Sequence, residues 1–445
     1  MSLSTQPLTD HPTPDSVVAW QPDGPVSRDR FLADASHLAG LLPAGGHILN
    51  ICQNRYHFLV GLGAAIVSGR VSLLPSTLTP EAIARLRSET PDLFCLHDGH
   101  PDTIDLPGLA FPTPLPLAGR NLPVPKIPVD QVVAHVYTSG STGIPLTHRK
   151  TWGALVINAL SEAERLGARG HALVGTVPPQ HMYGFESTVL ISLHGGAAAW
   201  SGRPFYPADI TVALAAVPPP RALVTTPFHL RTLLDAGVEV PPMDFILSAT
   251  APLSEELAAR AESTLGAPLH EIYGCTETGQ LASRRSTATR AWHLLGEVRL
   301  SPAGDGHVAS GGHVEGIVPI NDVVELTDER HFLLHGRNAD LVNIAGKRTS
   351  LAWLNQQLAG LPGVRDGVFF MPDEEPDDHV TRLCACVVAP DHTARSLLNA
   401  LRTRIDPVFL PRPLIFTDTL PRNAASKLPR ASLLALLPRK DKAGE

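Results

Sequence analysis

The chain has 445 residues, of which 43% are hydrophobic and 18% charged, a composition that can build cores and argues against a largely disordered protein. One ordinary core rarely extends over so long a chain, so we expect two or three domains or subdomains. The formal net charge of −7 gives no support for nucleic acid or an anionic membrane as a partner.

The five cysteines are odd in number and have neither the spacing of a disulfide framework nor that of a zinc site; they are Cys52, Cys95, Cys275, Cys384 and Cys386. A reducing compartment fits this pattern best. The N-terminal residues lack the basic and apolar regions of a signal peptide. No apolar run reaches the roughly 18 residues that span a bilayer. We therefore expect a soluble, cytoplasmic protein.

The first 115 or so residues alternate between helical and strand patterns. Helices are expected at 26–42 and 56–68, and short buried strands at 47–52 and 71–74. Thr79 is expected to begin a further helix, because Pro80 suits its first position. Such alternation predicts a largely parallel sheet.

A glycine-rich segment follows a strand pattern in the middle of the chain. Residues 131–137 (QVVAHVY) are largely apolar and β-branched, as in a strand buried on both faces. The next residues, with no side chain larger than Thr, are Thr138, Ser139, Gly140, Ser141, Thr142 and Gly143. Glycine lets the backbone approach a ligand closely, and successive N–H groups and hydroxyls can surround a phosphate. An ordinary Ser/Gly turn is the alternative. A P-loop kinase or NTPase is excluded, because no Lys follows Gly143.

The central part of the chain continues with a helix at 151–166 and a series of strands. Residues 176–184 are expected to form a strand leading into a loop that contains His181, Tyr183 and Gly184. Further buried strands are expected at 222–226, 245–249 and 269–273. The last of them ends in Gly274-Cys275-Thr276-Glu277-Thr278-Gly279. Ligands bind at the carboxyl ends of strands in open α/β sheets, so Glu277 is a candidate to hold Mg²⁺ on a nucleotide. The alternative is a loop carboxylate that caps the next turn.

Beyond residue 290 the pattern changes to short strands at 296–300, 307–310, 323–326 and 332–334, which predict an antiparallel meander. A smaller unit begins near residue 336. It is expected to contain helices at 352–359 and 392–405 and strands at 367–371 and 383–388.

Four segments together resemble the adenylate-forming enzymes: acyl- and aryl-CoA synthetases, adenylation domains of peptide synthetases, and luciferases. YTSGSTG at 137–143 resembles their phosphate loop, and YGCTETG at 273–279 resembles their second signature. GRNADLVNIAGKR at 336–348 is similar to their domain junction, and LPRNAASKLPR at 420–430 to their segment with the catalytic lysine. The resemblance covers nearly the whole chain, and four motifs in the right order are far more specific than any one.

The resemblance implies an α/β (α+β) fold with two domains. Residues 1–336 would form a large N-terminal domain of mixed, mostly parallel sheets with helices and a small distorted barrel. Residues 337–445 would form a small, mobile α+β domain that carries the catalytic lysine. The implied reaction uses ATP and Mg²⁺: a carboxylate attacks the α-phosphate to give acyl-AMP and pyrophosphate, and a thiol then displaces AMP.

The resemblance also assigns residues to the nucleotide. Thr138, Ser139, Gly140, Ser141, Thr142 and Gly143 would hold the β- and γ-phosphates, and Arg348 would lie near the phosphates. Thr276 and Glu277 would bind the α-phosphate and magnesium. Tyr273, followed by Gly274, would stack on adenine, with Ser248, Ala249, Thr250 and Ala251 on its other side. Asp322 and Arg337 would hold the ribose hydroxyls, since they have the family's spacing of fifteen residues.

For catalysis, the resemblance implies that Lys427 bridges the attacking carboxylate and the α-phosphate in the first half-reaction only. His181 would border the acyl pocket and take part in catalysis. Tyr183, Gly184, Cys275 and Gly279 are the further candidates for contact with the acid.

Several positions depart from the family pattern. The phosphate loop usually continues with Pro-Lys, whereas Pro145 is followed here by Leu146. Either Lys150 or Arg149 supplies this charge, or the loop functions without it. The hinge position, usually Asp or Lys, is Ala339.

The short N-terminal region and the small residues near the second signature favour an aryl or short unsaturated acid, such as a hydroxybenzoate, over a long fatty chain. The short ligases of aryl-polyene and xanthomonadin-type pigment clusters resemble the chain most, which favours a phosphopantetheinylated acyl carrier protein over CoA as acceptor and partner. The alternative from another class is a catalytically degenerate protein that binds nucleotide or acyl-AMP as a regulator. Retention of Glu277, Asp322, Arg337 and Lys427 favours the enzyme.

Overall fold

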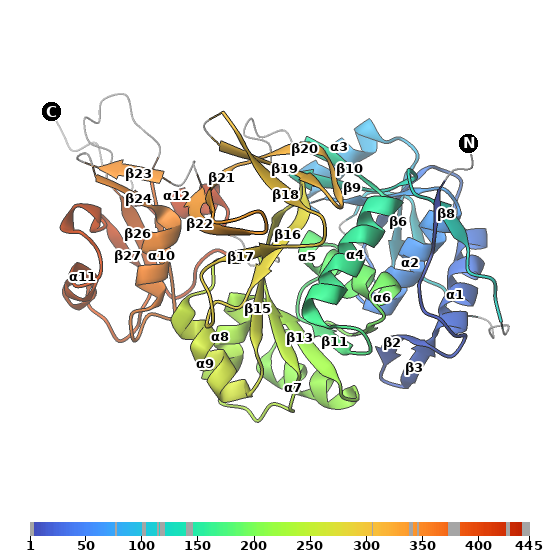
Figure 1. Cartoon of the computed structure of the whole chain (residues 1–445), viewed down its shortest axis with the longest axis horizontal. Coiled ribbons are helices and arrows are strands. Elements are labelled where there is room, and N and C mark those ends of the chain that lie inside the picture. The colour runs from blue at the N-terminus through green and yellow to red at the C-terminus, as the bar shows by residue number, and fades with distance from the viewer. Residues whose placement is uncertain are drawn as a thin grey trace.

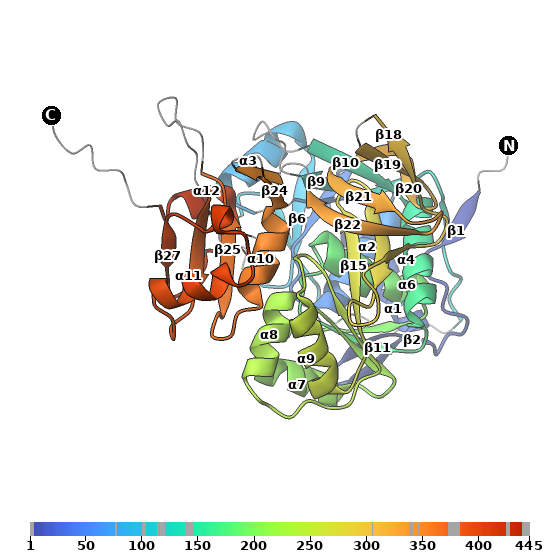
Figure 2. The same cartoon turned by 60° about the vertical axis from the view of Figure 1, so that its left-hand side comes forward.

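The structure is a computed structural model that describes residues 4–75, 78–99, 104–113, 115, 121–138, 146–304, 306–337, 341–344, 347–372, 383–423 and 428–437. Two large mixed sheets and several smaller ones carry helices on their faces (Figure 1). The predicted α/β (α+β) class is confirmed. The segment from β23 onward lies at one end of the molecule, beside α8 and α9 in both views (Figures 1 and 2).

The first large sheet has six strands in the order β10 (Leu146–Thr151), β9 (Val132–Thr138), β5 (Val71–Leu74), β4 (His47–Asn50), β6 (Leu93–His97) and β7 (Gly108–Ala110). All pairs are parallel except β10–β9. The accompanying helices are α1 (Arg28–Leu41), α2 (Arg55–Val67) and α3 (Pro80–Glu89). The side chains of Ser27, Asn54 and Thr79 cap these helices by accepting hydrogen bonds from first-turn N–H groups. The predicted alternation of helix and strand is confirmed here. A separate pair, β1 (Thr5–Pro7) and β8 (Lys126–Pro128), lies outside both large sheets.

The second large sheet has eleven strands in the order β21 (Asp322–Leu326), β22 (His331–Arg337), β17 (Trp292–Leu294), β16 (Gly279–Arg284), β15 (Leu269–Cys275), β14 (Phe245–Ser248), β13 (Arg221–Thr225), β11 (Ala172–Gly175), β12 (Ala198–Trp200), β2 (Val17–Gln21) and β3 (Gly24–Ser27). The strands from β15 to β2 are parallel, and the outer ones are antiparallel. The sequence did not reveal β2, β3, β11, β12, β16 or β17 as strands.

Alternate side chains of the parallel strands build a core on each face of this sheet, which explains their continuous apolar sequence. Leu223 and Ile246 join the core beneath α7 (Pro207–Ala216), α8 (Pro227–Asp235) and α9 (Glu255–Leu265). Val224 and Leu247 join the core on the opposite face, which includes residues of α4 (Trp152–Leu166) and α6 (Ile191–His194).

The predicted strand at 176–184 is wrong. Strand β11 ends at Gly175, and the chain continues through a short helical turn, α5 (Met182–Gly184), into a π-helix, Phe185–Leu190. A Cβ atom at Gly184 would lie 2.1 Å from the carbonyl oxygen of Pro178, so the turn requires glycine. π-Helical turns are rare and often mark functional sites.

The predicted antiparallel meander is confirmed, but the barrel is not. Strands β18 (Arg299–Ala303), β19 (Gly306–Gly311) and β20 (Val314–Ile320) form an open three-stranded sheet, and β16, β17, β22 and β21 extend the eleven-stranded sheet. No barrel closes among the described residues, because the outer strands pair with the large sheet instead.

The C-terminal segment has its own core, which includes Leu354, Leu358, Phe369 and Leu401. Its elements are β23 (Leu341–Ile344), β24 (Lys347–Ser350), α10 (Leu351–Ala359), β25 (Asp366–Phe370), β26 (Cys384–Val388), α11 (Ala394–Arg402), a 3₁₀ turn (Pro407–Phe409), β27 (Leu414–Phe416) and α12 (Arg430–Leu434). In the part of the chain that the structure describes, no helix has the length and apolar character to cross a membrane.

Candidate functional site

The carboxyl end of β14 carries two buried hydroxyl groups that lack hydrogen-bond partners within the described structure. They are Ser248 Oγ and Thr250 Oγ1. Thr250 also has a φ of +79°, a conformation that is strained for a β-branched residue and persists only where the surroundings enforce it. Ala249, between them, is buried. Unpaired polar groups and backbone strain together make this turn, predicted to border adenine, a candidate ligand-binding site.

The predicted nucleotide residues of β15 and β21 lie next to each other. The Tyr273 hydroxyl donates a hydrogen bond to Asp322 Oδ2 at 2.7 Å, and the Tyr273 ring packs against those of Trp292 and Phe332. Asp322 lies directly opposite Arg337 in the antiparallel pair β21–β22. Fifteen residues of sequence therefore separate two positions that the sheet makes direct neighbours.

The second signature forms a tight turn after β15. A Cβ atom at Gly274 would lie 2.3 Å from the Gly279 carbonyl oxygen, and Gly279 has a φ of +79°, so both glycines are required by the backbone. Thr276 and Glu277 are half-buried at the apex. Burial raises the pKa of Cys275 to about 11, and its thiol lies 3.1 Å from the Thr278 hydroxyl. Burial therefore favours the protonated thiol of Cys275.

His181 and Tyr183 belong to the turn before the π-helix. His181 caps it, since its Nδ1 accepts a hydrogen bond from the Tyr183 N–H at 3.3 Å. The Tyr183 hydroxyl donates to the Leu247 carbonyl oxygen of β14 at 2.9 Å, and burial raises the pKa of this hydroxyl well above its usual value. The hydroxyl of Tyr183 thus ties the turn before the π-helix to the strand that ends at Ser248.

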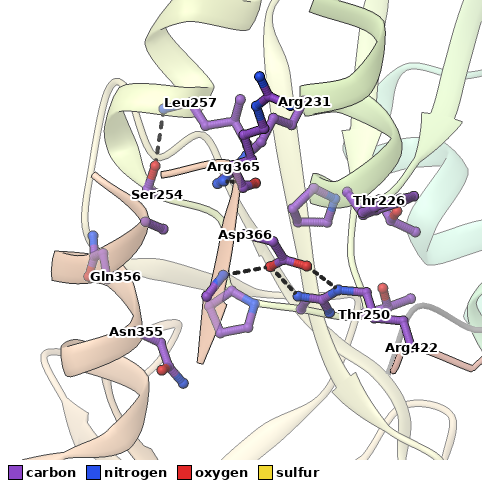
Figure 3. A pocket seen from close by; sticks show the side chains of 16 residues that line it. Thr226, Arg231, Thr250, Ser254, Leu257, Asn355, Gln356, Arg365, Asp366 and Arg422 are labelled. Carbon is purple, nitrogen blue, oxygen red and sulfur yellow. Dashed lines mark hydrogen bonds and ion pairs between the residues drawn. The ribbon is translucent and has the colours of Figure 1, made fainter. Parts of the chain in front are cut away.

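A pocket of about 100 Å³ lies between the Thr250 turn and the C-terminal segment (Figure 3). Its lining includes Thr226, Arg231, Thr250, Ala251, Asp366 and Arg422. Arg422 binds both carboxylate oxygens of Asp366, at 2.6 and 2.8 Å. Arg231 of α8 donates to the Arg365 carbonyl oxygen at 2.7 Å. The segment 420–430 therefore begins beside the Thr250 turn.

Several predicted residues lie outside the described structure: Ser139, Gly140, Ser141, Thr142 and Gly143 of the phosphate loop, Ala339, and Lys427. The side chains of Thr138, Arg337 and Arg348 are likewise outside it. Their backbones lie at the end of β9, at the end of β22 and in β24. Strand β10, which the sequence did not predict, pairs Leu146 with Thr138, so the strands before and after the phosphate loop are antiparallel neighbours.

Sequence reasoning also missed a buried polar cluster behind Gly279. It consists of Lys150, Asn158, Glu162, Glu186, Ser187, Gln280 and His313, all less than 9% exposed. Burial raises the pKa of Glu162 to about 7 and that of Glu186 to about 8, which Lys150 opposes and Glu162 reinforces. Burial lowers the pKa of His313 to about 4. The available signal was the presence of Glu162 and Glu186 within largely apolar helical segments, α4 and the π-helix.

The side chains at this site could supply only part of the coordination of a magnesium ion, as is usual where the ion is bound mainly through a nucleotide. Among the described residues no group of three or more His, Cys, Asp or Glu side chains is arranged to hold a metal. Mg²⁺ is commonly bound by one or two carboxylates together with substrate phosphates. Glu277, half-buried at the apex of the turn, has the chemistry for that single carboxylate.

The model of the AMP-binding enzyme family matches residues 13–330, and the chain belongs to this family. It is 31% identical over 230 residues to a 4-coumarate–CoA ligase of Rhodobacter capsulatus, a match that covers 51% of this chain and 57% of that ligase. It is 24% identical over 473 residues to the fatty acid–[acyl-carrier-protein] ligase ScoC of Streptomyces coeruleorubidus, covering 90% of this chain and 88% of the relative.

Among solved structures, the chain is similar to o-succinylbenzoate CoA synthetase (MenE) from Bacillus subtilis in complex with its acyl-adenylate intermediate. The TM-score is 0.80 at 19% identity, and the match covers 97% of this chain and 98% of the other. The similarity confirms the expected fold. The resemblance to ligases of pigment clusters stays a prediction.

Proposed function

We propose that the protein is an ATP-dependent acid–thiol ligase. A carboxylate oxygen attacks the α-phosphorus of ATP, the bond from that phosphorus to the β-phosphate oxygen breaks, and pyrophosphate leaves. A thiol sulfur then attacks the acyl carbon of acyl-AMP, the acyl–oxygen bond breaks, and AMP leaves. Residues 1–336 would bind ATP and the acid, and residues 337–445 would supply Lys427 and move between the two steps.

The observation that carries this proposal is the convergence of distant segments on one place. The strained Thr250 turn follows β14 and shares a pocket with Arg422. Tyr273, bonded to Asp322, lies near the carboxyl end of the neighbouring strand β15. Open α/β sheets bind ligands at these ends. Two anions must meet in the first step, so fixed dipoles and cations are needed there.

Each group has a proposed part in that step. The phosphate loop and Arg348 would hold the phosphates, Asp322 and Arg337 the ribose, and Thr276 the α-phosphate. Mg²⁺, held by Glu277 and the phosphates, would neutralise charge on the leaving group. Lys427 would stabilise the charge that develops between the carboxylate and the α-phosphate.

For the acid, we propose an aryl or short unsaturated one. Ligases named for 4-coumarate and 4-chlorobenzoate among the relatives support an aryl acid, as do the tight turns at Gly184 and Gly274. The acceptor is proposed to be a phosphopantetheine thiol, either of CoA or of a carrier protein. The relatives include ligases of both kinds.

The test is acid-dependent release of pyrophosphate from ATP and Mg²⁺ across aryl, short and long-chain acids. Each acid is assayed alone, with CoA, and with a phosphopantetheinylated carrier protein. We expect release with one class of acid and product formation with one thiol. Release that favours long-chain acids would refute the proposed acid class.

The second candidate function is a nucleotide or acyl-AMP binder without turnover. It is favoured by Leu146, which is 59% exposed at the position where the family has a loop lysine, and by Ala339. ATP binding with no pyrophosphate release from any acid would establish it in place of the ligase.

A further inference from the structure

Lys150 is a buried lysine that contacts the turn of the second signature, residues 273–279. Its Nζ donates a hydrogen bond to the Glu277 carbonyl oxygen at 2.7 Å, and the residue is only 6% exposed. Long side chains with a charge are almost never buried so fully unless they are paired. This burial and this hydrogen bond indicate that Lys150 has a structural role at the turn that carries Glu277.

The alternation of β10 determines which of its residues reach this turn. Lys150 is buried and His148 half-buried, whereas Thr147 and Arg149 are exposed. His148 and Lys150 share one face of the strand, and Glu277 is close enough to both to influence their pKa values. Arg149 is on the other face, so of the two residues that sequence analysis offered as a replacement cation, Lys150 faces the signature.

Residues around Lys150 also pack against Gly279, at the other end of the same turn. Asn158 Nδ2 donates to Glu186 Oε1 at 2.6 Å, and Glu186 is the acid with the largest electrostatic effect on Lys150. A Cβ atom at Gly279 would lie 2.8 Å from Glu186 Oε1 and 3.2 Å from Asn158 Nδ2. The turn is thus bonded at Glu277 and closely packed at Gly279.

We propose that Lys150 is a positioning residue: it fixes the main chain of Glu277, and thereby aims the Glu277 carboxylate at the magnesium ion of bound ATP. The inference rests on the proposed function only in assigning Glu277 to Mg²⁺.

The test compares Lys150→Met, which keeps the length of the side chain but removes its donor and charge, with Lys126→Met, the same change at an exposed lysine of β8. Calorimetry measures ATP binding across a Mg²⁺ titration, and pyrophosphate release is measured with the best acid. Loss of a group that orients a metal ligand commonly weakens metal affinity about 10–100-fold. We expect such a rise in the Mg²⁺ requirement for Lys150→Met and none for Lys126→Met.

Two further variants distinguish a positioning role of Lys150 from an effect on folding stability and from an effect of positive charge on β10. Glu186 influences Lys150 electrostatically, and in Lys150→Met/Glu186→Gln both side chains are uncharged. We therefore expect any loss of melting temperature seen in Lys150→Met to be reduced in the double variant while the Mg²⁺ requirement stays high. Arg149→Met tests the other candidate cation. An unchanged Mg²⁺ requirement in Lys150→Met, its recovery in the double variant, or a shift seen with Arg149→Met instead would each overturn the proposal.

Failure of the proposed function has a different signature. If no acid supports pyrophosphate release by the wild type, the ligase proposal fails, but Mg²⁺-dependent ATP binding still reports on Lys150.

Discussion

Replacing Glu162 by Gln should make the protein more stable at neutral and alkaline pH. Glu162 is fully buried in α4, and neither carboxylate oxygen makes a hydrogen bond of good geometry with a described residue. Ser187 and Gln280, which lie beside it, bond to each other at 2.8 Å. Glutamine has the same shape and carries no charge, so the variant removes the cost of burying a carboxylate.

The size of this effect follows from the difference in the pKa of Glu162 between the folded and unfolded states. Burial raises the pKa of Glu162 from its usual 4.5 to about 7, which corresponds to about 3 kcal/mol. Because the folded state holds the proton more tightly, this stability is fully present below about pH 4.5 and is lost as the pH rises through about 7. The stability gained by Glu162→Gln over the wild type should therefore grow by about 3 kcal/mol across that window.

Chemical denaturation between about pH 5 and about pH 8 measures this difference, and comparison of variant with wild type at each pH cancels most other titrations. Glu164→Gln, the same substitution at an exposed position of α4, is the matched control. A difference between Glu162→Gln and wild type that does not change with pH would refute the reasoning, because it would mean that the Glu162 carboxylate stays solvated in the folded protein.

Three further substitutions test the proposed chemistry. Lys427→Ala should abolish acyl-AMP formation while largely keeping thiol transfer from supplied acyl-AMP; equal loss of both steps would remove its assigned role. Leu146→Lys should leave the melting temperature unchanged, since Leu146 is exposed, and should tighten ATP binding measured by calorimetry unless another group already occupies that place. Tyr273→Phe removes the hydrogen bond to Asp322 and should raise the KM for ATP by about 3- to 10-fold, with little effect on the KM for the acid; an unchanged KM for ATP would separate this pair from nucleotide binding.

Local patterns in the sequence predicted the longer helices and many of the buried strands, but they missed many of the short strands. Ser27 and Thr79 cap their helices as expected for residues that begin a helical pattern. The strand expected at 176–184 was the main error, because β11 covers Ala172–Gly175 and ends before this segment. The sequence pattern led to no prediction for the segment that follows, Phe185–Leu190, which forms the π-helix. Only its packing between β11 and α4 decides for the π-helix.

The sequence also identified the residues of the signatures, but it did not show which other residues those signatures contact. The sequence predicted Glu277, Asp322 and Arg422's segment as separate motifs, each at the end or edge of an element. It could not place Lys150, since an isolated lysine in a polar hexapeptide gives no sign of burial.

Local patterns along the chain were enough to predict the longer helices, many of the buried strands and the family, because these depend on residues close together in sequence. The tertiary structure alone decided that Lys150 lies beneath Glu277, that Tyr273 bonds Asp322, and that Arg422 shares a pocket with Thr250. These pairs are far apart in sequence, and their contacts depend on sheet order and strand register, which only the packing of the whole core fixes.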